Sequence, residues 1–338
     1  MTEQILDIAS HWLGDGRSVA LATVVGTWGS SPCPTGSQML VAESGQFAGS
    51  VSGGCVESAV IEAALKVLAS GTPALLEFGV SDERAWEVGL ACGGQVRIYV
   101  QALAGATGMR LELLQSIRAA QQAGRAVALL TWIADGRQQL LALDVLEWPE
   151  FSAAHSAAVR SAAMSNQSSL MESESGDIFI HILNPPLRMI IIGAVHIGQY
   201  LAVQAQACGY EVIIVDPRTT FAAAERFPGL RVVTDWPDQA MAALRPDSRT
   251  AVIALSHDPK LDDPALASAL QSEAFYIGAL GSRRNQAARK ARLCEAGFNT
   301  AQCDRIHGPV GLDIHAQSPA EIAVAIMAEV IAVARRPK

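Results

Sequence analysis

The sequence lacks an excess of positive charge. Its 25 Lys and Arg residues are outnumbered by 33 Asp and Glu residues, which gives a formal net charge of −8, and the basic residues form no long run. Affinity for a phosphate backbone depends on clustered Lys and Arg, so the composition argues against a nucleic-acid partner.

Long hydrophobic runs are also lacking, although half of the residues are hydrophobic. No apolar run reaches the ~18–20 residues that span a bilayer. The first residues have neither the basic start nor the small-residue cleavage site of a secretory signal. We therefore expect a cytoplasmic protein with no membrane partner.

The six cysteines include no Cys-x-x-Cys pair, which indicates free thiols rather than a disulfide framework or a structural zinc site.

A proline pair separates two parts of the chain that differ in pattern. Asn184-Pro185-Pro186 interrupts strand pairing, because proline has no amide donor and restrains its neighbours. Before it, residues 16–23 resemble residues 124–131, and each segment follows a helical pattern and precedes two strand patterns. This similarity predicts a mixed α/β domain with an internal duplication. The predicted domains are 1–184, with a motif-bearing part at 1–105 and a scaffold copy at 106–184, and 185–338.

After the proline pair, short apolar runs alternate with helical patterns. This alternation predicts a C-terminal Rossmann-like domain with a doubly wound parallel sheet. The expected strands are 188–192, 211–215, 230–233, 250–255, 275–278 and 305–307. The expected helices are 196–208, 220–227, 237–244, 262–272, 283–295 and 319–334.

The most distinctive stretch is Gly49-Ser-Val-Ser-Gly-Gly-Cys-Val-Glu57, between a strand pattern and a helical pattern. Its glycines allow a ligand to approach the backbone closely, and amides at a helix start bind phosphate or another anion. The helix dipole there favours the thiolate form of Cys55. Cys92-Gly-Gly94 also combines a cysteine with two glycines, but the cysteine precedes the glycines instead of following them. One hypothesis is that both loops face one pocket, and the alternative is two tight turns with small buried cysteines.

A second motif resembles a dinucleotide-binding turn. Gly193-Ala-Val-His-Ile-Gly198 lies between an expected strand and an expected helix, where a Gly-x-Gly-x-x-Gly turn belongs. Asp216 ends the next strand, the position of a ribose-binding carboxylate. Val195 replaces the middle glycine, which normally leaves room for the pyrophosphate. The context therefore predicts the fold, while Val195 argues against tight NAD(P) binding; His196 is either a hydrogen-bond donor or a residue that starts the helix.

Polar clusters follow the later strands of the second domain. They are Ser256-His257-Asp258 with Asp262 and Asp263, Gly281-Ser282-Arg283-Arg284, and the segment 307–313. The carboxyl ends of parallel strands line the ligand crevice, so these clusters should converge near His196. Ser282 and Arg283 suit an anionic ligand, and His257 and Asp258 are candidate metal ligands. Turns, caps and solvated charges are the alternative.

Together these stretches resemble the XdhC/CoxI family, the accessory proteins of molybdenum hydroxylases of the xanthine dehydrogenase type. The matching stretches are 29–36, 49–57 and 92–94 in the first domain and 193–198, 215–218, 221, 225–228, 256–258, 276–284 and 308–314 in the second. Two positions depart from the family pattern. Val195 interrupts the usual Gly-x-Gly-His turn, and Cys33 stands where a basic residue is expected.

The resemblance implies a molybdenum cofactor chaperone without catalytic residues, rather than an enzyme with a turnover of its own. The cofactor would be molybdopterin or its dinucleotide form. Such a protein protects the cofactor, presents it to a cysteine desulfurase and inserts it into an apo molybdenum hydroxylase. A cofactor nucleotidyltransferase and a second copy of the chain, in a dimer, are further expected partners.

Cys55 is the candidate molybdenum ligand, because a soft thiolate suits a thiophilic metal. The residues expected to bind the cofactor are Ser52, Gly53, Gly54, Cys55, Cys92, Gly93, Gly94, Gly193, His196, Gly198, Asp216, Ser282 and Arg283. Three alternatives stay open. They are an NAD(P)-dependent oxidoreductase, a metal-dependent hydrolase or transferase that uses His257, Asp258 and Asp262, and a scaffold that only binds other proteins.

Overall fold

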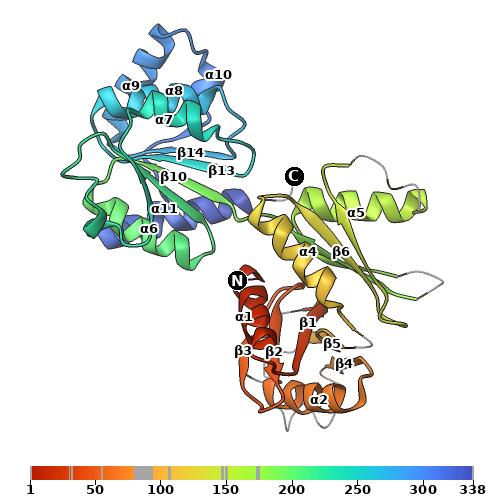
Figure 1. Cartoon of the computed structure of the whole chain (residues 1–338). Coiled ribbons are helices and arrows are strands. Elements are labelled where there is room, and N and C mark those ends of the chain that lie inside the picture. The colour runs from red at the N-terminus through yellow and green to blue at the C-terminus, as the bar shows by residue number, and fades with distance from the viewer. Residues whose placement is uncertain are drawn as a thin grey trace. The chain divides into compact units, whose positions relative to one another are not determined.

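The structure is a computed structural model (Figure 1) that describes residues 2–29, 31, 33–54, 56–79, 94–105, 108–145, 148, 151–172 and 176–336. The chain divides into two compact units, Met1–Pro185 and Pro186–Lys338. The division falls at the proline pair. Among the helices that the structure describes, none combines the length and the apolar character needed to cross a bilayer.

The first half of unit 1 is an antiparallel sheet with strand order β3-β2-β1-β5-β4. Its elements are α1 (Thr2–Gly14), β1 (Val19–Trp28), β2 (Gln38–Ala42), β3 (Phe47–Gly49), α2 (Glu57–Ser70), β4 (Ala74–Phe78) and β5 (Gln95–Ala102). Most of β1 is buried on both faces, as its continuous apolar run predicts. α2 covers one face of this sheet, where Val60 and Ala64 pack in one cluster with Ala22 and Ile98.

The second half of unit 1 repeats this arrangement. Its elements are α4 (Leu111–Gln122), β6 (Val127–Trp132), β7 (Gln138–Ala142), α5 (Ala153–Ser165), β8 (Ser169–Met171) and β9 (Ile178–Leu183). The strand order β7-β6-β9-β8 corresponds to β2-β1-β5-β4 of the first half. The duplication predicted from one short sequence similarity therefore agrees with the topology. It extends to α5 and β8. The many Ala and Ser residues of α5 show little apolar periodicity, and β8 has only three residues.

The two sheets of unit 1 face each other. Val25 of β1 and Tyr99 of β5 cluster with Phe179 of β9, and α1 and α4 share a core with strands of both sheets. α5 covers the outer face of the second sheet, where Val159 packs with Leu130. Unit 1 thus has the layers α2, sheet, sheet and α5, with two helices at the interface between the sheets.

Unit 2 is built on a six-stranded sheet with order β12-β11-β10-β13-β14-β15. All of its neighbouring strands are parallel. Its elements are β10 (Arg188–Ile192), α6 (His196–Ala207), β11 (Glu211–Val215), the 3₁₀ turn η1 (Ala224–Arg226), β12 (Arg231–Val233), α7 (Pro237–Leu244), β13 (Thr250–Ala254), α8 (Pro259–Leu270), β14 (Tyr276–Ala279), α9 (Arg283–Glu295), α10 (Thr300–Cys303), β15 (Ile306–His307) and α11 (Pro319–Ala334). α6 and α11 cover one face and α7, α8 and α9 the other (Figure 1). The Rossmann-like, doubly wound prediction is confirmed.

One predicted helix of unit 2, at 220–227, is wrong. Only η1 forms there, because the Arg226 side chain donates hydrogen bonds to the carbonyl oxygens of Ala194 and Phe221. These bonds fix the segment across the end of the sheet as a turn. α8 starts three residues before the predicted position, because the Asp258 side chain caps it by accepting a hydrogen bond from the Lys260 amide. All six predicted strands are present, with ends that differ by at most one residue.

Two glycines of the β2–β3 hairpin provide a test of the close packing around β3. Gly45 and Gly49 have nearly equal φ angles of +82° and +83°. An added Cβ at Gly49 would overlap the Gln38 carbonyl oxygen and the Ile5 side chain, whereas one at Gly45 would have no atom within 4 Å. We expect Gly49→Ala to lower the free energy of unfolding of unit 1 by roughly 3 kcal/mol or more, from left-handed strain plus overlap. Gly45→Ala should cost only the strain, about 1–2 kcal/mol.

Urea unfolding followed by tryptophan fluorescence measures this difference. The signal reports mainly on unit 1, which contains Trp12, Trp28, Trp86, Trp132 and Trp148, whereas unit 2 contains Trp236. Equal losses for the two variants would contradict the tight contact at Gly49.

Candidate functional site

The first candidate site lies at one end of the first sheet of unit 1. β1 and β3 end there, and β2 and β5 begin there, because the strands are antiparallel. The topology therefore brings the loops 29–37 and 50–56 and the buried Gly94 to the same end of the sheet. Cys55, Cys92 and Gly93 lie outside the described residues, so the site is defined by the residues that flank them.

The Glu57 carboxylate holds residues 50–54 in place from the first turn of α2. It accepts hydrogen bonds from the hydroxyls of Ser50 at 2.7 Å and Ser52 at 2.6 Å. It also accepts bonds from the main-chain amides of Ser52 at 3.1 Å and Gly54 at 3.0 Å. Only 9% of Glu57 is exposed. The carboxylate thus fixes the loop up to the residue before Cys55.

These hydrogen bonds also set the ionisation of Glu57. Burial raises the pKa of its carboxyl, but the hydrogen bonds from Ser52 and Ser50 outweigh burial, and the pKa lies below its usual value. The negative charge is further favoured by its place at a helix N-terminus. The negative charge at the start of α2 is therefore supplied by the Glu57 carboxylate rather than by a bound ligand. A phosphate on the amides of Ser52 and Gly54 would have to displace it.

Cys33, from the loop 29–37, contributes a thiol to the same cluster. Its Sγ donates a hydrogen bond to the Ser52 carbonyl oxygen at 3.1 Å and lies 3.9 Å from the Ser50 hydroxyl. Burial raises the pKa of Cys33; the hydrogen bond with Ser50 opposes this effect, and the Glu57 charge adds to it. Cys33 is therefore a thiol at neutral pH. Sequence reasoning gave it no role, because its partners are 17 and 19 residues away.

The second candidate site lies at the carboxyl edge of the sheet in unit 2, where three strand ends meet. Gly193 follows β10 with φ +101°, and an added Cβ would lie 2.9 Å from the Ser256 amide that follows β13. The Asp216 carboxylate, after β11, accepts a hydrogen bond from the Ala194 amide at 2.8 Å. Gly198 is also required by close packing, since its Cβ would lie 3.1 Å from the Gly193 carbonyl oxygen.

The residues between these glycines have separate environments. Val195 is the N-cap of α6 and is half-buried against the core. His196 begins α6 and is exposed. Its Nδ1 lies 3.1 Å from the Gln199 side-chain oxygen, and its ring contacts the ring of Tyr200 edge-on.

Asp216 is fully buried and holds Arg218 in place. Its carboxylate accepts hydrogen bonds from the Arg218 amide at 3.0 Å and from the guanidinium at 2.8 and 2.7 Å. Burial raises the pKa of Asp216, but the Arg218 side chain outweighs it, and the pKa is lowered. The Arg218 guanidinium lies 4.1 Å from the Phe221 ring centroid. This edge therefore presents a fixed cation, Arg218, which was not among the predicted site residues.

The remaining predicted residues of unit 2 lie at helix starts. The Ser282 hydroxyl caps α9 by accepting a hydrogen bond from the Asn285 amide at 3.3 Å, and Arg283 begins the helix exposed to solvent. His257 is exposed and has a left-handed backbone with φ +62°. Asp258 caps α8.

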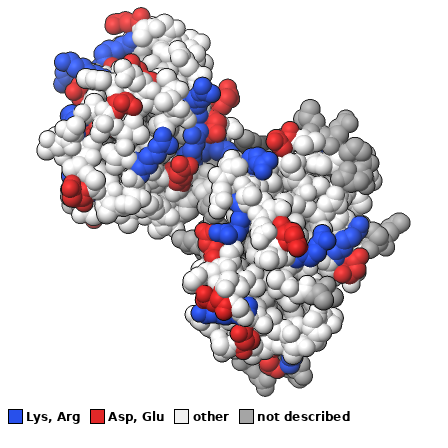
Figure 2. Space-filling model, viewed as in Figure 1, with Lys and Arg blue, Asp and Glu red and all other residues white. Residues whose placement is uncertain are grey.

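The metal-site hypothesis finds little support in this geometry. Asp262 is buried, accepts a hydrogen bond from the Ser256 hydroxyl at 2.6 Å and pairs with Arg289 at 3.3 Å. Across the described ranges, no group of three or more His, Cys, Asp and Glu residues is arranged to hold a metal ion. Figure 2 shows Lys and Arg interspersed with Asp and Glu on the face in view.

Fold and sites together define a two-unit α/β protein whose second unit is a Rossmann-type domain. The sequence model of the XdhC and CoxI family matches residues 12–79, and the model of the XdhC Rossmann domain matches residues 189–330. The chain belongs to the XdhC and CoxI family, so the resemblance seen in the sequence is confirmed.

Relatives align over nearly the whole chain. An Escherichia coli protein named molybdenum cofactor insertion chaperone PaoD is 30% identical, over 97% of this chain and 87% of its own length. A Bacillus subtilis protein, named as a probable subunit of xanthine dehydrogenase, is 26% identical, over 96% of both chains. A crystal structure described as a xanthine dehydrogenase from Bacillus halodurans has a TM-score of 0.79 at 25% identity, over 98% of this chain and 96% of that one.

The role of Glu57 can be tested through the pH dependence of stability. A carboxyl with a lowered folded-state pKa contributes stability above its unfolded pKa, about 4.3, and the contribution is lost as the pH falls through the folded pKa. We expect Glu57→Gln to lower the free energy of unfolding of unit 1 at pH 7 by roughly 1–3 kcal/mol. The difference from the wild type should shrink below about pH 4. Urea unfolding at a series of pH values measures both.

The matched control is Glu62→Gln on the same helix, where Glu62 is exposed and pairs with Lys66 at 2.7 Å. This variant should follow the wild-type pH profile closely. If Glu57→Gln kept wild-type stability at pH 7, Glu57 would not be the group that holds the loop.

Proposed function

We propose that the chain is a molybdenum cofactor chaperone that serves an apo molybdenum hydroxylase of the xanthine dehydrogenase type. The observation that carries this proposal is the alignment, over nearly the whole of both chains, with a relative named for insertion of that cofactor. The cofactor is the cargo of the protein, which holds and protects it, presents it to a cysteine desulfurase and passes it to the apo-enzyme. A cofactor nucleotidyltransferase and a dimeric state belong to the same proposal.

In unit 1, the loop 50–56 would hold the metal end of the cofactor. Glu57 fixes the residues on the N-terminal side of Cys55 through four hydrogen bonds, so residues 50–54 are ordered before any cargo arrives. A Cys55 thiolate is the soft ligand that suits molybdenum. Gly53 and the segment Cys92-Gly93-Gly94 would complete this site. Cys33, with its raised pKa, would donate a hydrogen bond rather than bind the metal.

In unit 2, the carboxyl edge of the sheet would bind a phosphate-bearing group. Arg218 is held by Asp216 with part of its side chain exposed, and Arg283 begins α9. Guanidinium groups and helix starts are both suited to phosphate. Gly193 and Gly198 would form the tight turn at the start of α6, next to His196, because both are closely packed against the chain itself. A dinucleotide form of the cofactor would supply such a group.

The amount of molybdenum cofactor that co-purifies with the protein tests the role of Cys55. We expect Cys55→Ser to fold like the wild type but to retain at least roughly 10-fold less molybdenum on co-purification, because losing even an outer-shell partner costs that much at a metal site. Molybdenum by elemental analysis and pterin by fluorescence give two independent readouts. Cys208→Ser is the control, because Cys208 is an exposed thiol at the end of α6.

Unchanged loading of Cys55→Ser would remove Cys55 from the site. A wild-type chain that binds no cofactor, or that cannot restore activity to an apo molybdenum hydroxylase, would overturn the chaperone proposal itself.

The alternative function is an NAD(P)-dependent oxidoreductase, which the parallel sheet and the position of Asp216 favour. The Asp216 carboxylate, however, already accepts four hydrogen bonds from the chain itself. We therefore expect no saturable change in NADH or NADPH fluorescence up to about 1 mM, a concentration that would reveal interactions stronger than about −4 kcal/mol. Saturation below that concentration would instead support the oxidoreductase.

A further inference from the structure

The outer surface of α6 and α11 in unit 2 carries little charge. The two helices lie side by side on one face of the sheet (Figure 1), and a side-chain hydrogen bond links them. The charged residues in the two helices are Glu321 and Glu329. Glu329 is largely buried, because its carboxylate accepts hydrogen bonds from the Tyr276 hydroxyl at 2.6 Å and the Gly311 amide at 2.8 Å. Glu321 is therefore the charge that these helices present to solvent.

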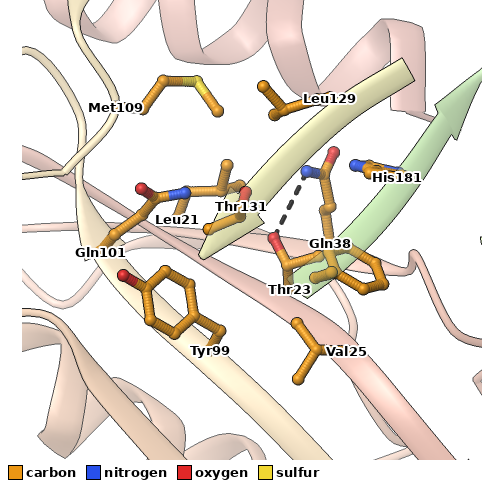
Figure 3. A pocket seen from close by; sticks show the side chains of 11 residues that line it. Leu21, Thr23, Val25, Gln38, Tyr99, Gln101, Met109, Leu129, Thr131 and His181 are labelled. Carbon is orange, nitrogen blue, oxygen red and sulfur yellow. Dashed lines mark hydrogen bonds between the residues drawn. The ribbon is translucent and has the colours of Figure 1, made fainter. Parts of the chain in front are cut away.

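Apolar side chains occupy this outer surface instead. Val203 of α6 is 65% exposed, Val324 of α11 is 50% exposed and Tyr200 of α6 is 40% exposed. On the other face of the sheet, α9 contains five Arg or Lys residues and one Glu among its 13 residues. In unit 1 the apolar inner faces of the two sheets cover each other, with Leu21 and Leu129 among the residues between them (Figure 3). A contiguous exposed apolar surface such as that of α6 and α11 is typical of an interaction site.

The outward side of α11 has a regular pattern. Glu321, Val324, Ala328, Ile331 and Arg335 follow one another at steps of three, four, three and four residues, and each is exposed or half-buried. This spacing places the five residues in one line along the helix. It is also the spacing of the contact line between two packed helices. The line therefore has the geometry of a helix–helix contact, although its side chains are exposed.

The same line is symmetric about Ala328. Glu321 lies seven residues before it and Arg335 seven residues after it, while Val324 and Ile331 lie four before and three after. If a second α11 packs antiparallel with Ala328 facing Ala328, Val324 of each copy faces Ile331 of the other. Each Glu321 then faces Arg335 of the other copy. The small alanine at the centre allows the helices to approach closely, so the line is complementary to itself in shape and in charge.

The two end charges are too far apart to pair within one chain. They are separated by 14 residues, which is about 21 Å along a helix. The Glu321 carboxylate is held at its end of α11, because it accepts hydrogen bonds from the amides of Gln317 at 2.7 Å and Ser318 at 2.9 Å. The position of its charge is thus fixed before any second copy binds.

We propose that the outer surface of α6 and α11 is the interface of a symmetric dimer, with two antiparallel α11 helices at its centre. A two-fold axis brings the same patch of both copies together, so the patch must be complementary to itself. Tyr200 and Val203 of α6 would extend the contact beside α11. The surface measures about 24 Å by 20 Å, or about 500 Å² on each copy, which is at the low end for a specific interface. We therefore expect a dimer that dissociates on dilution.

Analytical ultracentrifugation of the full chain tests this interface. The wild type should sediment at about 0.1 mM as a dimer with twice the chain mass of 35.6 kDa. Ala328→Glu places two carboxylates against each other at the symmetry axis, so the dissociation constant of the dimer should rise at least roughly 10-fold. The control is Ala288→Glu on α9, where the alanine is exposed on the other side of the sheet and no change is expected.

An exchange of charges tests the antiparallel arrangement. Glu321→Arg and Arg335→Glu should each raise the dissociation constant about five-fold, because each places like charges together at both ends of the contact. The double variant should regain most of the wild-type affinity, since opposite charges face each other again. Loss of the helix cap at Glu321 is common to one single variant and the double variant, so it cannot produce this recovery. Circular dichroism checks that every variant is folded.

A weakened Ala328→Glu dimer together with recovery in the double variant supports the proposal. A wild type that stays monomeric at about 0.1 mM overturns it, and unit 1 or the apo-enzyme is then the occupant of this surface. A dimer that is unaffected by Ala328→Glu also overturns it and places the contact elsewhere. The dimeric state rests on the proposed function, but none of these measurements involves molybdenum cofactor. Cofactor loading, measured separately, thus distinguishes failure of the interface from failure of the chaperone role.

Discussion

The candidate site of unit 1 depends on one buried carboxylate. Glu57 receives four hydrogen bonds from the loop that precedes it, and these bonds keep it ionised despite its burial. A helix start that would otherwise attract a phosphate is thereby neutralised internally. Residues 50–54 are held without a ligand, so the free-energy cost of ordering them is met during folding rather than during binding.

Unit 2 also contains a buried carboxylate that accepts hydrogen bonds from the chain, but this carboxylate holds a cation in place. The buried Asp216 accepts the Ala194 amide and holds Arg218, so a position that is typical of ribose binding instead supports a cation. The two sites therefore differ in charge. The described part of the first presents a carboxylate and a neutral thiol, and the second presents a guanidinium.

Sequence reasoning succeeded where a single local pattern decides the structure. Short apolar runs predicted the six strands of unit 2, and the similarity of 16–23 to 124–131 predicted the duplication in unit 1. It failed at 220–227, where Arg226 bonds to carbonyls outside its own segment. It missed the roles of Cys33 and Arg218 for a related reason. Cys33 contacts Ser52 and lies near Glu57, and Arg218 pairs with Asp216. Such tertiary contacts produce no periodic pattern in the sequence.

The internal neutralisation in unit 1 also limits how cargo can approach it. A phosphate near Ser52 and Gly54 would meet the Glu57 charge and would find both amides occupied, so its binding there is opposed by repulsion and by lost hydrogen bonds. A thiophilic metal centre needs neither amide, because its bond is to a sulfur ligand. The occupied amides and the Glu57 charge thus argue against a phosphate at this loop, where the proposed Cys55 ligand would instead place the metal end of the cofactor.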